Sequence, residues 1–393
     1  MDARELRRIA ADRFDDLVDA LREMVDIDSG SYTPEGVNRI ADLCQARFEA
    51  DGWSVRRIPH RPDEGQAQLG DLVVGRLDGS GGPRILMIGH TDTVFDPGTA
   101  ADRPFTTHGE RATGPGVSDM KSGLVLGFFA VEVLREVGFE RFGSITYLCN
   151  PDEEIGSPFS RPHIEEAATD ADAALVLESG RENGGIVSAR KGVSDYRIEV
   201  VGRAAHAGVE PHKGRSAVLE AAHKIVALHA LNGRWSGVTV NAGIVHGGTR
   251  TNVVAERCVV EVDLRSPAEA SLREAEAAVE EIAATHTVPD VTVEVSAGKW
   301  HRPMERSEAV ARLAKVAAEV GRELGLELHE ASTGGASDAN TTAGHGVPTL
   351  DGLGPVGGSA HAPQEWMDLR SVVPRMALLA GIISKLGSRP PRG

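Results

Sequence analysis

The sequence predicts an α/β protein whose largely parallel sheet is flanked by helices, with a second, α+β domain inserted in mid-chain. Short apolar runs alternate with helical segments in the first half of the chain, which is typical of a layered α/β domain. The order then changes to β-α-β-β-α-β, and the first pattern resumes afterwards. The length of 393 residues also favours two domains, because one hydrophobic core seldom serves so many residues.

The first α/β segment begins with a charged amphipathic helix, in which Leu6, Ile9, Phe14, Leu17 and Leu21 lie on or near one face. Further helices are expected at residues 36–51 and 122–137. Apolar runs that predict strands occupy residues 72–77, 84–89, 145–149 and 173–177. This alternation indicates a largely parallel sheet.

The inserted segment has the order of a ferredoxin-like unit. Its expected strands and helices are strand 195–201, helix 213–231, strands 237–245 and 253–264, helix 267–285 and strand 291–295. A helix at 307–324, a strand at 348–350 and a helix at 372–386 then complete the first domain. We therefore predict an α/β domain built from residues 1–189 and 298–393, with an inserted domain at 190–297.

Composition narrows the class of protein. The chain has 58 acidic and 42 basic residues and a net charge of −16, which argues against nucleic acid and anionic membranes as partners. No apolar run approaches the roughly 18 residues of a membrane span, and the N-terminus lacks the apolar region of a signal peptide. The three cysteines are widely spaced and indicate no disulfide framework, so we expect a cytoplasmic protein.

Polar side chains follow the apolar runs at the points where the predicted strands end. The candidates are His90 and Asp92, Glu153 and Glu154, and Glu178, together with Asp119 and His361 in glycine-rich loops. Taken singly, a histidine after a strand is most often a surface residue, and adjacent carboxylates usually lie in a solvated loop. Ligands of open α/β sheets bind outside the carboxyl ends of the strands, where these side chains would converge. Histidines and carboxylates without a cysteine pair are the donors expected for zinc bound by nitrogen and oxygen.

Other catalytic motifs are missing or incomplete. The segment GPGVSDMKS lacks the glycine directly before lysine that a phosphate-binding loop needs. His361 and Glu365 are four residues apart, but the chain has no HExxH motif. There is no GxSxG elbow either, so a serine hydrolase is unsupported.

Six short motifs in order resemble those of the zinc exopeptidase family, which includes glutamate carboxypeptidase, aminoacylase, acetylornithine deacetylase and succinyl-diaminopimelate desuccinylase. They are HTDTV from His90, GVSDMK around Asp119, DEE ending at Glu154, ES at Glu178, RAAHAG around His206, and SAH ending at His361. The inserted domain also looks like the lid and dimerisation domain of that family. The resemblance covers nearly the whole chain and implies a homodimer formed through this domain.

The resemblance implies a role for each site residue. Asp119 would bridge two divalent ions, with zinc expected and cobalt or manganese as alternatives. One ion would be completed by His90 and Glu178, and the other by Glu154 and His361. Asp92 would orient the imidazole of His90. Glu153 would be the general base acting on the metal-bridging water, and His206 would polarise the scissile carbonyl from the partner subunit.

Within the family, the segments PDEEIGS, ARKGV and TGGASDAN resemble the glutamate carboxypeptidase branch. This resemblance implies that Lys191, Asn252, Arg265 and Arg302 bind substrate carboxylates or serve lid closure. The expected reaction is hydrolysis of an amide or peptide bond that releases a C-terminal amino acid, with glutamate favoured. An aminoacylase, deacetylase, desuccinylase or dipeptidase on the same site stays open. A non-catalytic metal-binding protein would require a lost ligand or a lost Glu153, and none is lost.

Overall fold

The computed structural model describes residues 2–388, and the chain divides into two compact units. Unit 1 takes in the residues up to Ser188, residues 306–332, and the residues from Ser337 onward. Unit 2 takes in residues 189–305 and 333–336. Each unit has its own cluster of buried hydrophobic side chains.

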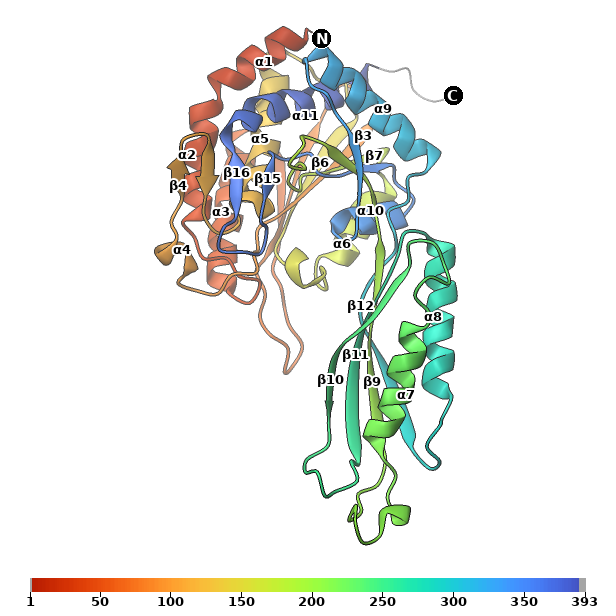
Figure 1. Ribbon diagram of the computed structural model, residues 1–393. Helices are drawn as coiled ribbons and strands as arrows, with labels where there is room; N and C mark the ends of the chain where they lie inside the picture. The colour runs from red at the N-terminus through yellow and green to blue at the C-terminus, as the bar shows by residue number, and fades with distance from the viewer. Residues whose placement is uncertain (1, 389–393) are drawn as a thin grey trace. The chain divides into compact units, whose positions relative to one another are not determined.

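Unit 1 is built on a six-stranded sheet in the order β1-β2-β6-β3-β7-β14 (Figure 1). The four strands β6, β3, β7 and β14 run parallel, while β2 and β1 add antiparallel strands at one edge. This arrangement confirms the predicted α/β class with a largely parallel sheet. The bounds are β1 (Ser54–Ile58), β2 (Leu72–Asp78), β3 (Arg84–His90), β6 (Ser144–Asn150), β7 (Ala173–Val176) and β14 (Thr349–Leu350).

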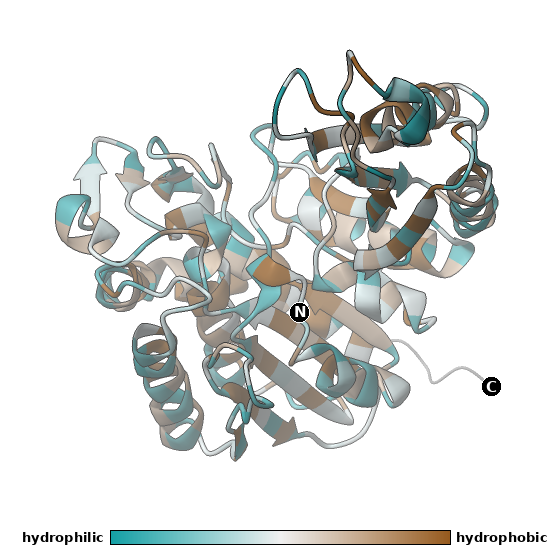
Figure 2. Cartoon of the chain, turned by 90° about the horizontal axis from the view of Figure 1, so that it is seen from below, coloured by the Kyte–Doolittle hydropathy of each residue, from teal (hydrophilic) through white to brown (hydrophobic). Residues whose placement is uncertain are grey.

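The central strands are buried on both faces, so they are continuous apolar runs rather than alternating ones. Figure 2 shows such hydrophobic stretches along the strands. In the register of β3 with β6, His90 lies opposite Asn150, so both strands end at the same edge of the sheet. The side chains that follow these strands are therefore brought together.

The helices of unit 1 pack around this sheet. Their bounds are α1 (Ala3–Asp12), α2 (Phe14–Val25), α3 (Pro34–Ala50), α4 (Thr99–Asp102), α5 (Ser122–Glu136), α6 (Arg161–Thr169), α9 (Glu308–Glu323), α10 (Asp338–Gly344) and α11 (Val372–Gly387). The single helix expected at the N-terminus is two helices that meet at Arg13. The break lets Leu6 and Ile9 of α1, and Leu17 and Leu21 of α2, all reach the core.

Several short strands were not expected from the sequence. Four of them form a small sheet in the order β15-β16-β5-β4. The short strands are β4 (Thr106–His108), β5 (Arg111–Thr113), β8 (Ile186–Arg190), β13 (Glu330–Thr333), β15 (Gly357–Gly358) and β16 (Trp366–Asp368). The four strands of this small sheet have only two or three residues each, which is too short for a period-two pattern of about four to eight residues.

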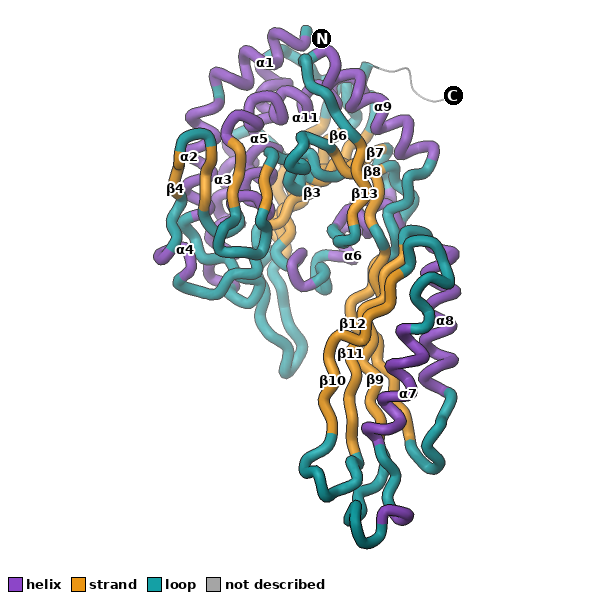
Figure 3. Tube along the Cα trace, in the orientation of Figure 1, coloured by secondary structure: helices purple, strands orange, loops and turns teal. Residues whose placement is uncertain are grey.

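Unit 2 has the predicted order β-α-β-β-α-β, and its sheet is antiparallel in the order β10-β11-β9-β12 (Figures 1 and 3). Helices α7 and α8 cover one face of this sheet. Its elements are β9 (Gly192–Val201), α7 (Ala217–His229), β10 (Thr239–Gly247), β11 (Arg257–Ser266), α8 (Glu269–Ala284) and β12 (Thr292–His301). Strand β10 is an edge strand, so one row of its backbone groups has no partner strand within the described chain.

Within residues 2–388, no helix combines the length and the apolar character needed to cross a membrane.

Candidate metal centre

His90 is the last residue of β3, and its side chain is only 1% exposed. Its Nδ1 lies 3.0 Å from the carbonyl oxygen of Asp92 and 3.4 Å from an oxygen of the Asp92 carboxylate. Its Nε2 lies 3.2 Å from Asp119 Oδ1 and 3.6 Å from Glu178 Oε1. The imidazole is thus held through Nδ1 and presents Nε2 to two carboxylates, which is how proteins orient a metal-ligating histidine.

Asp119 faces two imidazoles from a short segment before α5. Its Oδ1 is 3.2 Å from His90 Nε2, and its Oδ2 is 3.1 Å from His361 Nε2. The peptide bond between Asp119 and Met120 is cis. The two distances show that each oxygen of the Asp119 carboxylate points to a different histidine, as a bridging ligand requires.

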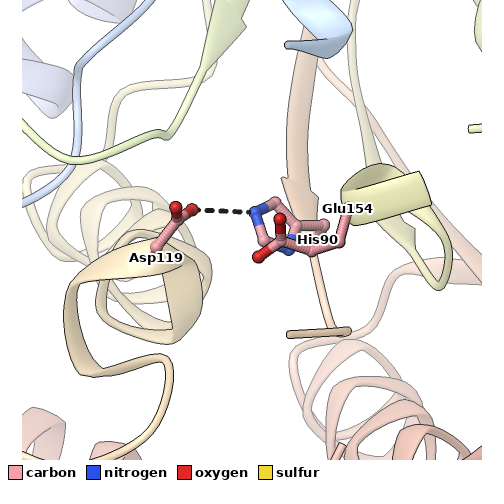
Figure 4. Close-up of side chains that lie close together, drawn as sticks. All are labelled: His90, Asp119 and Glu154. Carbon is pink, nitrogen blue, oxygen red and sulfur yellow. Dashed lines mark hydrogen bonds and ion pairs between the residues drawn. The ribbon is translucent and has the colours of Figure 1, made fainter. Parts of the chain in front are cut away.

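The other two carboxylates follow β6 and β7. Glu154 Oε2 lies 3.1 Å from His361 Nε2, and Glu178 lies beside His90. The ligand atoms of His90, Asp119 and Glu154 all lie within 4.8 Å of one another, and so do those of His90, Glu153 and Glu178. Figure 4 shows the first group, with Asp119 reaching His90 from the opposite side to Glu154. All five predicted ligands therefore meet at one place in unit 1.

Close helix packing helps to bring Glu178 to this place. Gly123, in the first turn of α5, lies so close to the chain after β7 that an added Cβ would sit 1.8 Å from the carbonyl oxygen of Leu177. Only glycine permits this approach of the helix to the residue before Glu178. The sequence DMKSG thus provides both the ligand Asp119 and the contact that positions the end of β7.

The charges of the site act strongly on one another. Burial lowers the pKa of His90, but the contacts with Asp119 and Asp92 outweigh it and hold that pKa well above its usual value. Burial raises the pKa of Asp119, but the hydrogen bonds to His361 and His90 bring it far below its usual range. Burial and the neighbouring carboxylates Glu178 and Glu154 raise the pKa of Glu153 well above its usual value, although His90 opposes them. A divalent cation would relieve this crowding of carboxylates.

Asp92 does more than the predicted contact with His90. Its carboxylate is fully buried and accepts hydrogen bonds from the backbone N–H groups of Glu153 at 3.1 Å and Glu154 at 3.2 Å. It also accepts one from the Ser31 hydroxyl at 2.7 Å. Asp92 therefore fixes the turn that carries both glutamates, as well as standing beside His90.

Two groups of supporting residues were not identified from the sequence. Glu365 accepts three backbone N–H groups from the Asp119 segment. Burial raises its pKa to about 7, although these three hydrogen bonds act against the shift. Asp338, in α10, accepts hydrogen bonds from Ser157 Oγ at 2.5 Å and from the Asn150 side chain, on either side of the Glu153 turn. The spacing from His361 to Glu365 was visible in the sequence, but its meaning depends on contacts with distant residues.

The remaining predicted site residues all belong to unit 2. His206 and Asn252 lie together, since Val253 pairs with His206 and the Ala207 N–H donates to the Asn252 carbonyl oxygen at 3.0 Å. His206 is exposed, and its Nδ1 accepts the N–H groups of Gly208 and Val209, both at 3.1 Å. An Nδ1 that accepts hydrogen bonds leaves the proton of a neutral imidazole on Nε2.

The guanidinium of Arg265 is engaged within unit 2. It donates to both oxygens of Asp263 at 2.8–3.0 Å and to the Gly334 carbonyl oxygen at 2.7 Å. Arg302 is 45% exposed and lies 3.9 Å from a carboxylate oxygen of Glu269. The backbone N–H of Lys191 donates to Thr333 at 3.0 Å. A substrate carboxylate at Arg265 would therefore have to share or displace Asp263.

Comparison with known families identifies the class of protein that carries this metal centre. A model described as peptidase family M20/M25/M40 matches residues 86–385. The chain belongs to this family and is a metal-dependent hydrolase of the peptidase and amidohydrolase type. The predicted family and the predicted enzyme class are thereby confirmed.

Individual relatives agree with this assignment. The chain is 29% identical to carboxypeptidase G2 from Pseudomonas sp. (strain RS-16), over 98% of this chain and 92% of that protein. It is 28% identical to acetylornithine deacetylase from Myxococcus xanthus, over 62% of this chain and 65% of that protein. Among solved structures, aminopeptidase PepT from Bacillus cereus has a TM-score of 0.76 at 26% identity, covering 95% of this chain and 98% of that one.

Proposed function

We propose that the protein hydrolyses an amide or peptide bond next to a free carboxylate and releases a C-terminal amino acid, with glutamate favoured. The convergence of two histidines and three carboxylates on Asp119 carries this proposal. Similarity to carboxypeptidase G2 over 98% of the chain supports the hypothesis of a carboxypeptidase. Partial similarity to acetylornithine deacetylase supports an N-acyl-amino-acid deacylase as the second candidate.

The donor set fits two divalent cations. Imidazole nitrogens and carboxylate oxygens are suitable ligands for zinc, and cobalt or manganese can occupy similar sites. His90 and Glu178 would hold one ion, Glu154 and His361 the other, and Asp119 both. The orientation of the two Asp119 oxygens toward different histidines supports this division. When bound, such ions lower the pKa of water toward 7 and polarise a carbonyl.

Glu153 is the general base in this proposal. Its carboxylate lies among the ligand atoms of His90 and Glu178, and its pKa is raised by burial and by neighbouring carboxylates. A carboxylate whose pKa is raised is a stronger base, so it can take a proton from the attacking water and give it to the leaving nitrogen. The backbone hydrogen bond to Asp92 holds Glu153 at the start of its turn.

His206 is the proposed oxyanion donor, acting across a homodimer formed through unit 2. The neutral tautomer leaves an exposed Nε2–H free of the loop's own hydrogen bonds, and such a group can donate to a developing oxyanion. The edge strand β10 carries the exposed side chains of Ile244 and Val245. Helix α7 adds Val218, Leu219 and Val226, and Val218 lies against Gly247 of β10. An apolar edge of this kind favours a two-fold pairing of identical surfaces.

Two variants test the assignment of the adjacent glutamates. Glu153→Gln should abolish turnover and keep both metals, because the amide cannot act as a base but is not needed as a ligand. Glu154→Gln should weaken one metal. Elemental analysis and initial rates on acyl-glutamates separate these effects. Equal metal loss in both variants, or an active Glu153→Gln protein, would show that the roles are wrongly assigned.

A mixing experiment tests the role of His206. His206→Ala should lose about 100- to 1000-fold in kcat with its metals intact. When it is mixed with Glu153→Gln under conditions that exchange subunits, one site of each heterodimer would combine an intact Glu153 with an intact His206. Activity should then partly return. No recovery in a mixture shown to contain heterodimers would rule out action across the interface.

A further inference from the structure

We infer that Glu365 is a positioning residue for the metal centre, because its buried carboxylate holds the backbone of the segment that presents Asp119. This inference rests on the proposed function, in which Asp119 is shared by two metals. Glu365 is 1% exposed. Its Oε2 accepts the N–H of Gly116 at 2.9 Å, and its Oε1 accepts the N–H groups of Ser118 and Asp119, both at 2.8 Å.

The segment needs this support because it is not regular helix. Asp119 has φ −112° and ψ 95°, and Met120 has φ −129° and ψ 34°. Backbone N–H groups before a helix have no carbonyl partner from a preceding turn, and leaving them unsatisfied in a buried place is costly. One carboxylate satisfies three of them. Because these three hydrogen bonds converge on one buried side chain, Glu365 holds this irregular backbone in place.

The position of Asp119 decides the geometry of both proposed metal sites. Its two oxygens are 3.2 Å from His90 Nε2 and 3.1 Å from His361 Nε2, so a shift of its backbone alters both distances. In the ion pairs given above, Glu154 lies 3.1 Å from His361 and Glu178 lies 3.6 Å from His90. A defect transmitted through Asp119 should therefore affect two metals, whereas a defect in either glutamate should affect one.

Glu365 also connects Asp119 to a second ligand along the chain. His361 lies four residues earlier, and the turn between them is closed by the Glu365 N–H donating to the Ala362 carbonyl oxygen at 3.1 Å. His361 has φ 63°, a left-handed conformation that is uncommon outside glycine and is kept only by its surroundings. The turn 361–365 thus carries the ligand His361 itself. Through the three hydrogen bonds of Glu365 it also holds the backbone of the ligand Asp119.

The substitution Glu365→Gln keeps the shape of the side chain and disturbs only its acceptors. If the amide oxygen serves Ser118 and Asp119, the amide NH₂ must face the N–H of Gly116. One acceptor is lost and two donors are brought together. Removing the outer partner of a metal ligand typically costs about 10- to 100-fold in metal affinity.

The chain offers a matched control in Glu220. Its carboxylate is also fully buried and accepts backbone N–H groups, from Thr287 at 2.9 Å and Val288 at 2.7 Å. It lies in unit 2, which contains none of the five proposed ligands. Glu220→Gln therefore measures what a generic loss of a buried carboxylate does to the fold and to metal binding.

The experiment titrates Co²⁺ into the metal-free full-length protein, with a competing chromogenic chelator, and records the visible spectrum of the bound ion. Urea unfolding of each metal-free variant gives its stability. We expect Glu365→Gln to lose at least tenfold in affinity for both Co²⁺ ions and to change their spectrum. Glu220→Gln should stay within about twofold of the wild type, because a supporting residue affects metal affinity through contact with a segment that carries a ligand.

Three results would overturn the inference: wild-type affinity and spectrum in Glu365→Gln, weakening of one ion only, or equal weakening in Glu220→Gln. If Glu365→Gln yields no folded protein, Glu365→Asp replaces it, since the charge is kept while the shorter side chain cannot reach all three N–H groups. Wild-type Co²⁺ affinity in Glu365→Asp would also overturn the inference. A wild-type protein that binds fewer than two Co²⁺ ions contradicts the proposed function itself, which separates the two failures.

Discussion

Replacing Asp92 by asparagine should damage both the fold and the reaction, because this one carboxylate supports two parts of the metal centre. It accepts the N–H groups of Glu153 and Glu154 and the hydroxyl of Ser31, and it stands beside His90. Asparagine has nearly the same shape, but one of its two terminal atoms is a donor. At least one buried N–H or hydroxyl then faces another donor.

The size of the effect follows from these contacts. A buried group left without its partner costs about 1–3 kcal/mol. Ser31 can rotate its hydroxyl away, whereas the N–H groups of Glu153 and Glu154 are fixed by the turn. We therefore expect a loss of about 1–3 kcal/mol in the free energy of unfolding. The carbonyl oxygen of Asp92, 3.0 Å from His90 Nδ1, is unchanged, so the histidine keeps its main contact. A loss of about 10- to 100-fold in kcat/KM should then arise from the displaced glutamates.

Urea unfolding of the metal-free proteins and initial rates at saturating Zn²⁺ measure the two effects. Ser31→Ala is the control, since it removes one donor from Asp92 and leaves both glutamate N–H groups paired. That variant should lose less than tenfold in kcat/KM. An Asp92→Asn protein with wild-type stability and activity would contradict this role of Asp92, and so would a Ser31→Ala protein with an equal loss.

Three further outcomes are expected. Protein purified without chelator should contain two divalent metals per chain by elemental analysis, and a saturated content of one or none would contradict the five-ligand site. Acyl-glutamates should exceed their C-terminal amides by at least about tenfold in kcat/KM, equivalent to roughly 1.4 kcal/mol, and a smaller ratio would speak against recognition of the carboxylate. Burial raises the pKa of Glu220, but its hydrogen bonds to Val288, Lys224 and Thr287 bring it below the usual 4.5. The stabilising effect of the Glu220 carboxylate should be complete above pH 4.5 and should disappear as the pH falls through the lower folded-state pKa. The urea midpoints of wild type and Glu220→Gln should therefore converge in acid. A constant difference between them would contradict this.

The class of fold and the candidate ligands could be predicted from the amino-acid sequence alone. Buried parallel strands require continuous apolar runs, so β3, β6 and β7 were visible as such, and the polar residues that end them were visible too. Strands that end at one edge of a sheet bring those residues together, which is why His90, Glu154 and Glu178 could be grouped before any distance was known. The order β-α-β-β-α-β of unit 2 follows from local periodicity in the same way.

The residues that support the site could not be predicted, because their contacts join parts of the chain that no local sequence pattern relates. Gly116 and Glu365 are 249 positions apart, and a carboxylate accepting three backbone N–H groups leaves no periodic signal at either end. The family resemblance implies that Arg265 binds a substrate carboxylate, and only the folded structure shows that its guanidinium also contacts Asp263 and Gly334. The residue types show which chemistry is possible, and the folded structure shows which of these side chains already contact one another.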